Sequence, residues 1–308
     1  MTGVCRLPGG FGLAHVQERG EQPPRVASAD VLPTSRGSLL QALQAGVARR
    51  ALARSRCVDV MALGDYSLLQ IVPPPVPDAE LRDASRWQIR ELIDYPIDEA
   101  LIDVFRVPSE GMRGRSAIAY VVSAHRSLVK EQVNQLKAAR LKIHAIDIPE
   151  LAVRNLAALL PEEPRGVIFV YLGSTRGLIT ICRAGNLCLA RNINIGVEQL
   201  KAHPDIAAGR KEDDSHVNDL LDSVVLEIQR SLDFYESNFA LPPIASLVVA
   251  SIEPELPVVI PYLQNYLGLG VRAFVPAEVL DCAHLEADKV SRCLLAIGAA
   301  LRDRQVAP

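Results

Sequence analysis

A turn of small polar residues lies between two apolar runs near the middle of the chain. The run VIFVYL ends at Leu172, the turn Gly173-Ser174-Thr175 follows, and the apolar run GLITICR comes next. Apolar runs on both sides of a short turn predict a β-hairpin. Backbone N–H groups in such a turn can bind a phosphate. A magnesium nucleotide also needs carboxylates close by, because Mg²⁺ is held by oxygen ligands.

Those carboxylates are missing from the local sequence. Residues 166–197 contain no Asp or Glu. A second glycine-containing segment, with Gly9 and Gly10, also lacks them, since the first acidic residue of the chain is Glu18. At either turn a Mg²⁺ ion would be held by phosphate and water alone. We therefore interpret Gly173–Thr175 as a phosphate hairpin without its catalytic groups, and the alternative is an ordinary turn.

No other group of residues has the pattern of a catalytic or metal site. The six cysteines show no C-x-x-C spacing, and no histidine stands at ligand spacing to them. We expect six reduced thiols rather than disulfides. The acidic pairs Glu162-Glu163 and Asp213-Asp214 lie in polar segments, where solvated loops are expected. His144 lies in an apolar run and is interpreted as a core residue.

Composition narrows the class of protein. The 308 residues are 49% hydrophobic and 22% charged, as in ordinary globular domains. The formal net charge of -3 gives no electrostatic reason to bind nucleic acid. The apolar runs are far shorter than about 20 residues, so no membrane span is predicted. The N-terminal segment lacks the pattern of a signal peptide.

Both halves of the chain run from strands to helices. In the first half we expect strands around a hairpin in 11–34, a helix in 38–56, a two-stranded hairpin in 57–72 and paired strands at 100–107 and 116–123. In the second half we expect a three-stranded meander in 166–196, a long helix in 216–238 and a final helix in 289–302. This repeated order predicts two similar lobes with a cleft between them.

Three aromatic residues of the first half lie on or after a helix that is predicted to begin at Pro77-Asp78-Ala79. Trp87 is the only tryptophan, and Tyr95 and Phe105 follow it closely. Aromatic side chains of this kind can anchor a protein partner. They can also form the core of a small subdomain, which is the interpretation we favour.

Several segments resemble one family when they are taken in order. They are RWQIRELIDYPIDEALIDVFRV, KAARLKIHAIDIPELAVRNL, RNINIGVEQL, LEIQRSLDFYESNF and LLAIGAALR. Over nearly its whole length the chain resembles the PilM/MshI group, actin-like proteins of type IV and MSHA-type pilus assembly. It is also similar in plan to the cytoplasmic part of the GspL-type secretion protein.

The resemblance implies an α/β fold of two actin-like lobes, the duplicated RNase H-like fold of actin-like ATPases. The first lobe would cover 1–160, with an inserted subdomain at about 73–125. The second would cover 161–308, with the terminal helix 289–302 packing back on the first lobe.

The resemblance also locates a nucleotide site. The residues of this chain differ there from the pattern of the family. Relatives that bind ATP have an Asp-x-Gly sequence at each of two hairpins and a glycine pair beside the adenosine. Here Tyr171 takes the acidic position, and Ala250-Ser251-Ile252-Glu253 replaces the glycine pair. The candidate, degenerate nucleotide residues are Gly9, Gly10, Gly173, Ser174 and Thr175. We expect no catalytic residue, no ATPase activity, no metal and no resident cofactor, with ATP and Mg²⁺ as the disfavoured alternative.

By the same resemblance, the chain is expected to be a cytoplasmic scaffold at the inner membrane. Its partner would be the cytoplasmic tail of a PilN/MshJ-like inner-membrane protein, with Trp87, Tyr95 and Phe105 as candidate contacts. Other pilus assembly proteins and a homodimer are further possible partners. An ATP-binding switch of the same machinery is the alternative. A sugar-kinase-like enzyme would need a catalytic Asp in the cleft, which the sequence does not identify.

Overall fold

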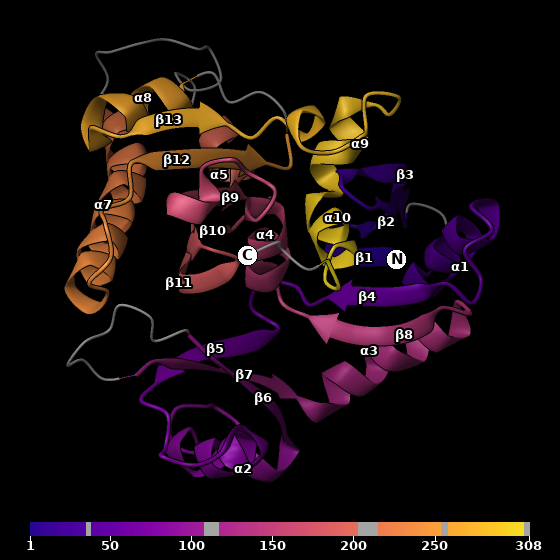
Figure 1. Ribbon diagram of the computed structural model, residues 1–308. Coiled ribbons are helices and arrows are strands. Elements are labelled where there is room, and N and C mark those ends of the chain that lie inside the picture. The colour runs from indigo at the N-terminus through magenta and orange to yellow at the C-terminus, as the bar shows by residue number, and fades with distance from the viewer. Residues whose placement is uncertain (35–37, 108–116, 203–214, 254–257, 305–308) are drawn as a thin grey trace.

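The computed structural model describes residues 1–34, 38–107, 117–202, 215–253 and 258–304. These residues form two five-stranded sheets and one three-stranded sheet (Figure 1). Short 3-10 helices connect some of the elements: η1 (Ile97–Glu99), η2 (Glu163–Arg165) and η3 (Pro276–Glu278).

The first five-stranded sheet has the order β3-β2-β1-β4-β8. Its strands are β1 (Thr2–Leu7), β2 (Gly10–Arg19), β3 (Gln22–Pro33), β4 (Arg56–Val60) and β8 (Lys142–Asp147). Strands β1 to β3 are antiparallel, whereas β4 is parallel to both β1 and β8. Helices α1 (Leu39–Arg49) and α3 (Arg126–Ala138) share a buried cluster with one face of this sheet. The start of α1 is set by a capping box between Ser38 and Gln41.

The second five-stranded sheet has the corresponding order β11-β10-β9-β12-β13. Its strands are β9 (Val167–Leu172), β10 (Gly177–Arg183), β11 (Asn186–Ile193), β12 (Ser246–Ser251) and β13 (Gly270–Ala273). The accompanying helices are α5 (Val197–Ala202), α7 (Ser215–Asn238) and α8 (Val259–Leu267). In each sheet an antiparallel meander is extended by two parallel strands. The predicted repetition of the two halves is therefore confirmed.

The three-stranded sheet belongs to the insertion in the first half and has the order β5-β7-β6. Its strands are β5 (Tyr66–Ile71), β6 (Ala100–Arg106) and β7 (Ala119–His125), and α2 (Asp78–Gln88) packs on it. The expected hairpin in 57–72 is wrong, because β4 and β5 lie in different sheets. Strand β4 pairs with β1 on one edge and β8 on the other, so it has no free edge for β5. The expected pairing of 100–107 with 116–123 is confirmed.

The inserted sheet packs on the second lobe, as Figure 1 shows. Tyr120 is buried in the same cluster as the core of the second lobe, and Phe105 packs against that cluster. The two rings lie 5.5 Å apart. The amide of Ala190, on β11, donates a hydrogen bond to the Tyr120 hydroxyl at 3.2 Å. The insertion thus contacts the second lobe through both apolar packing and a hydrogen bond.

The C-terminal segment forms two helices rather than one: α9 (Ala287–Arg292) and α10 (Leu294–Ala300), which meet at Cys293. Helix α10 lies between the lobes and packs on β1, β2, β4 and α4 (Pro149–Ala157) (Figure 1). Two glycines allow this close packing. A Cβ on Gly298 would lie 2.2 Å from the carbonyl oxygen of Ala152, and one on Gly3 would lie 1.7 Å from that of Ala296.

All six cysteines are buried and have free thiols. Among the helices of the described residues, none combines the length and the apolar character needed to cross a membrane.

Candidate functional site

The two lobes meet at a cleft of about 430 Å³. The first lobe contributes residues 5–8, at the end of β1, and residues 61–63, after β4. The second lobe contributes Tyr171, the turn 173–176 and Ile252, and Leu295 of α10 completes the lining. The cleft expected from the repeated sequence pattern is therefore present, and Gly173, Ser174 and Thr175 line it.

Gly9 and Gly10 are not among the residues that line this cleft. Gly9 has a φ of +68° in the turn between β1 and β2, and its carbonyl accepts hydrogen bonds from the Thr34 amide (2.8 Å) and hydroxyl (2.7 Å). A Cβ on Gly10 would lie 2.2 Å from the Leu32 carbonyl oxygen. Both glycines are thus explained by the turn and by close strand packing.

The second turn is bound to the start of α5. The Ser174 hydroxyl donates to the carboxylate of Glu198. The amides of Val197 and Glu198 donate to the carbonyls of Gly173 (2.8 Å) and Ser174 (2.9 Å). The first amides of a helix are the groups that would attract a phosphate. Here the turn's own carbonyl oxygens occupy two of them.

Further hydrogen bonds fix the shape of this turn. The Gly173 amide donates to the Arg176 carbonyl at 3.0 Å, and the Gln199 side-chain amide donates to the Thr175 carbonyl at 3.0 Å. Within the described part of the chain, the amides of Ser174 and Thr175 have no hydrogen-bond partner. These two N–H groups are the donors that the turn could still offer to an anion.

A cation from the second lobe reaches across the cleft. The Arg176 guanidinium donates to the Leu63 carbonyl at 3.3 Å. It also fills the space beside Gly64, where a Cβ would lie 2.4 Å from Nη1. The lining contains Arg6 and Arg176 and, among the described residues, no carboxylate. Its chemistry is that of a weakly cationic cleft, not of a Mg²⁺ site.

Tyr171 cannot replace the missing acid. Its side chain is only 3% exposed and belongs to the core cluster that contains Cys5 and Cys293. Burial raises the pKa of its phenol above the ordinary value, so the oxygen stays protonated. A neutral, buried phenol offers no charge to a metal ion.

Two buried carboxyl groups of the first lobe lie outside the lining. Asp59 shares its side of β4 with Cys57, which faces α1 and α3. Burial raises its pKa to about 7, against the opposing effect of Arg6. Burial likewise raises the pKa of Glu150 to about 7, and this carboxyl group accepts a hydrogen bond of 2.5 Å from the Tyr66 hydroxyl. Neither group supplies the cleft aspartate that a kinase-like enzyme would need.

Strand β12 ends within Ala250–Glu253, the segment that stands in place of the adenosine-side glycines. The Ser251 hydroxyl accepts a hydrogen bond from the Glu253 amide at 3.1 Å, and Glu253 forms an ion pair with Lys201. Ser251 and Glu253 also line a second, mostly apolar hollow of about 380 Å³ beside Phe274. The Glu253 carboxylate is thus engaged with a lysine of α5.

The three candidate partner residues have different surroundings. Trp87 is 71% exposed, so the expectation that it forms a subdomain core is wrong. Its position on α2 directs it away from Leu81, Ser85 and Ile89, which are buried. Tyr95 is half-buried, with its hydroxyl 2.9 Å from the Ser123 hydroxyl. Phe105 packs toward the second lobe, as described above.

The residues present do not fit a magnesium nucleotide. In the described ranges, no group of three or more His, Cys, Asp or Glu side chains could hold a metal ion. Sequence reasoning missed Glu198 and Arg176, which shape the second turn. Glu198 directly follows the stretch 166–197 that lacks acidic residues. The helix predicted to begin there could have indicated that its carboxylate lies near the turn.

Comparison with known proteins gives the fold. No family model matches the chain, and no curated protein matches it. A chain of the "PilM-PilN type IV pilus biogenesis complex" superposes with a TM-score of 0.73 at 21% identity, covering 100% of this chain and 98% of that chain. The cytoplasmic domain of EpsL, an inner-membrane component of the type II secretion system of Vibrio cholerae, has a TM-score of 0.52 at 14% identity, covering 93% and 96%.

A third structure, a Bacteroides thetaiotaomicron protein with an actin-like ATPase fold and unknown function, has a TM-score of 0.52 at 7% identity, covering 95% of this chain and 94% of that one. The two-lobed actin-like fold implied by the sequence resemblance is therefore confirmed. The likeness to the PilM–PilN chain extends over the full length of the fold, including the insertion.

Proposed function

We propose that this chain is an actin-like scaffold of a pilus assembly platform and has no ATPase activity. The platform would be of the type IV or MSHA type, or similar to a type II secretion system, with the chain acting as its PilM/MshI-like component. It would work in the cytoplasm, held at the inner membrane by a partner.

The observation that carries this proposal is that the turn Gly173–Thr175 is already hydrogen-bonded to other groups of the protein. Its serine hydroxyl binds Glu198, two of its carbonyls bind the start of α5, and Arg176 bridges the cleft to Leu63. Hydrolysis of a nucleotide requires a metal and a positioned water. Among the residues that the structure describes, the lining offers no carboxylate for either task.

The proposed partner is the cytoplasmic tail of a single-pass PilN/MshJ-like membrane protein. Full-length likeness to a chain of a PilM–PilN complex supports this choice. The exposed Trp87 supports a contact through the inserted subdomain, since exposed tryptophans are enriched at binding hot spots.

Co-purification tests the scaffold role. The tagged full chain is expected to retain an inner-membrane component encoded with its own assembly system. Trp87→Ala should weaken this capture without changing thermal stability. Tyr266→Ala, which removes another exposed aromatic side chain (55% exposed) on the second lobe, is the matched control. Capture of none of these components by the wild-type chain would contradict the proposal.

An ATP-binding switch is the second candidate, favoured by the cleft volume and the two available amides of Ser174 and Thr175. A ligand present at 100 times its Kd adds about 2.7 kcal/mol to the free energy of unfolding. Thermal unfolding with several millimolar Mg-ATP therefore tests it. An upward shift of the unfolding midpoint would support the ATP-binding switch. An unchanged midpoint would contradict the switch and favour the scaffold role.

A further inference from the structure

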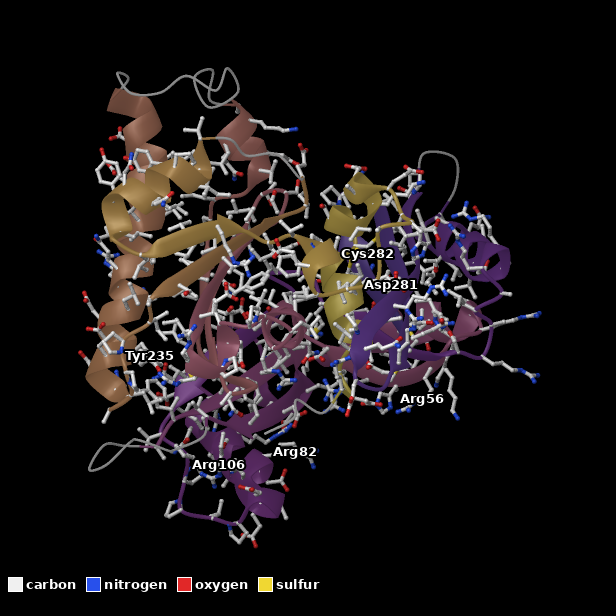
Figure 2. The ribbon with its side chains drawn as sticks, turned by 45° about the horizontal axis from the view of Figure 1, so that its top comes forward. Arg56, Arg82, Arg106, Tyr235, Asp281 and Cys282 are labelled. Atoms are coloured by element: carbon white, nitrogen blue, oxygen red, sulfur yellow. The ribbon has the colours of Figure 1, made fainter. Side chains whose placement is uncertain are left out.

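A second group of cations lies in the inserted subdomain, far from the cleft. A hollow of about 210 Å³ lies between α2 and the start of β6. Strand β6 is an edge strand of the three-stranded sheet. The residues around the hollow are Arg82, Asp83, Arg86, Ala100, Leu101, Ile102 and Arg126. Figure 2 labels Arg82 beside α2, in the lower part of the molecule.

Two guanidinium groups converge there on one oxygen atom. Nη2 of Arg86 lies 3.4 Å from the Ala100 carbonyl oxygen, and Nη2 of Arg126 lies 3.5 Å from the same oxygen. The sum of these distances limits the separation of the two nitrogens to 6.9 Å. Arg126 also donates to the Asp98 carbonyl at 3.3 Å.

Acidic groups lie nearby but are directed elsewhere, since the Glu99 carboxylate lies 2.8 Å from His125. Within the described residues, Arg86 and Arg126 form no ion pair with a carboxylate. The one carboxylate in the lining, Asp83, lies 3.7 Å from Arg82. Arg126 is also the first residue of the 13-residue helix α3, whose N-terminus adds partial positive charge. Like charges held this close repel each other, and an anion between them would remove that repulsion.

We propose that this hollow binds a single carboxylate, supplied by one acidic side chain of a protein partner. Guanidinium groups donate charge-assisted hydrogen bonds to carboxylates, and the two oxygens of one carboxylate can accept from two arginines at once. A polyanion fits poorly, because residues 78–106 contain eight acidic and only four basic side chains. The surrounding acidic surface would repel a nucleic acid or an anionic membrane. This inference does not depend on the pilus role proposed above.

Titration of the purified full chain with sodium acetate tests the site, with sodium chloride of equal ionic strength as reference. The readout is the NMR spectrum of the arginine Nε–Hε groups. We expect saturable shifts for Arg86 and Arg126, with a Kd on the order of 1–10 mM. Arg86→Gln and Arg126→Gln should each weaken binding about tenfold or more. Arg90→Gln, an exposed arginine outside the lining, is the control and should bind as the wild type does.

Two further titrations identify the source of the anion. A short glutamate-containing peptide with blocked ends should shift the same signals at a lower concentration than acetate does. Inorganic phosphate should shift them more weakly. Equal responses of wild type and Arg86→Gln would overturn the site. Tighter binding of phosphate than of the peptide would overturn the assignment to a carboxylate.

Discussion

The guanidinium of Arg176, in the second-lobe turn, donates a hydrogen bond to the carbonyl of Leu63 in the first lobe at 3.3 Å. The Ala190 amide and the Tyr120 hydroxyl join the second lobe to the insertion. These two hydrogen bonds add to the buried core cluster that both lobes share. Both Arg176 and Leu63 line the cleft.

Replacement of Arg176 tests the bridge across the cleft. Arg176→Ala should lower the free energy of unfolding by about 1 kcal/mol, the usual net value of a hydrogen bond of this kind. Urea denaturation monitored by circular dichroism measures the difference. Arg165→Ala, at an exposed arginine of the same lobe, should leave the stability almost unchanged. Equal stabilities of the two variants would show that the bridge contributes nothing.

Removal of one hydroxyl group tests the second connection. Tyr120→Phe keeps the buried ring and leaves the Ala190 amide without its partner, which should cost about 1–2 kcal/mol of folding stability. The midpoint of thermal unfolding is the measurement. Tyr266→Phe removes a hydroxyl from a side chain that is 55% exposed and serves as the control. A loss no greater than that of the control would refute the proposed role of the hydroxyl.

The Tyr66–Glu150 pair predicts a pH dependence. The pKa of Glu150 is about 7 in the folded chain, against 4.5 as its ordinary value. The folded state therefore holds the proton over a range in which the unfolded state has lost it. Stability consequently falls as the pH rises from about 4.5 to about 7, and this loss is complete above pH 7.

Glu150→Gln removes this titration, and its amide oxygen can still accept from the Tyr66 hydroxyl. The variant should match the wild type near pH 4 and exceed its free energy of unfolding by roughly 3 kcal/mol at pH 8. Denaturation curves at both pH values give the comparison, with the exposed Glu80→Gln as control. Asp59 titrates in both proteins, so its effect cancels. A stabilisation independent of pH would be inconsistent with this explanation.

The packing of α10 predicts a strong effect at one glycine. Gly298→Ala places a methyl group against the Ala152 backbone, which cannot move without shifting α4, and should destabilise the fold by about 2–3 kcal/mol. The matched change Gly270→Ala meets only the Ala245 oxygen at 3.5 Å and should be nearly neutral. Thermal unfolding of both variants tests this prediction. Similar midpoints for the two variants would argue against close packing of Gly298 on the Ala152 backbone.

Periodicity and the order of segments were sufficient to predict the repeated lobes, since these depend on local patterns. Strand pairing is not local. The run 57–72 contains two strands, but only the tertiary fold shows that both edges of β4 are already paired. Trp87 was expected in a core because burial favours aromatic residues, whereas Leu81 of α2 and Ile89, which follows that helix, are buried instead. Glu198 and Arg176 were missed because their effect on the turn depends on contacts across the second lobe.

The position of α10 has a consequence for protein synthesis. This helix packs against β1 and β4, although the sheet and the long helix of the second lobe separate it from them along the chain. While the ribosome makes the second lobe, the inner side chains of the first sheet, among them Cys5 and Val58, lack their covering helix. The first lobe can therefore finish folding only after the second has been translated, and exposed apolar surface of this kind is what chaperones bind.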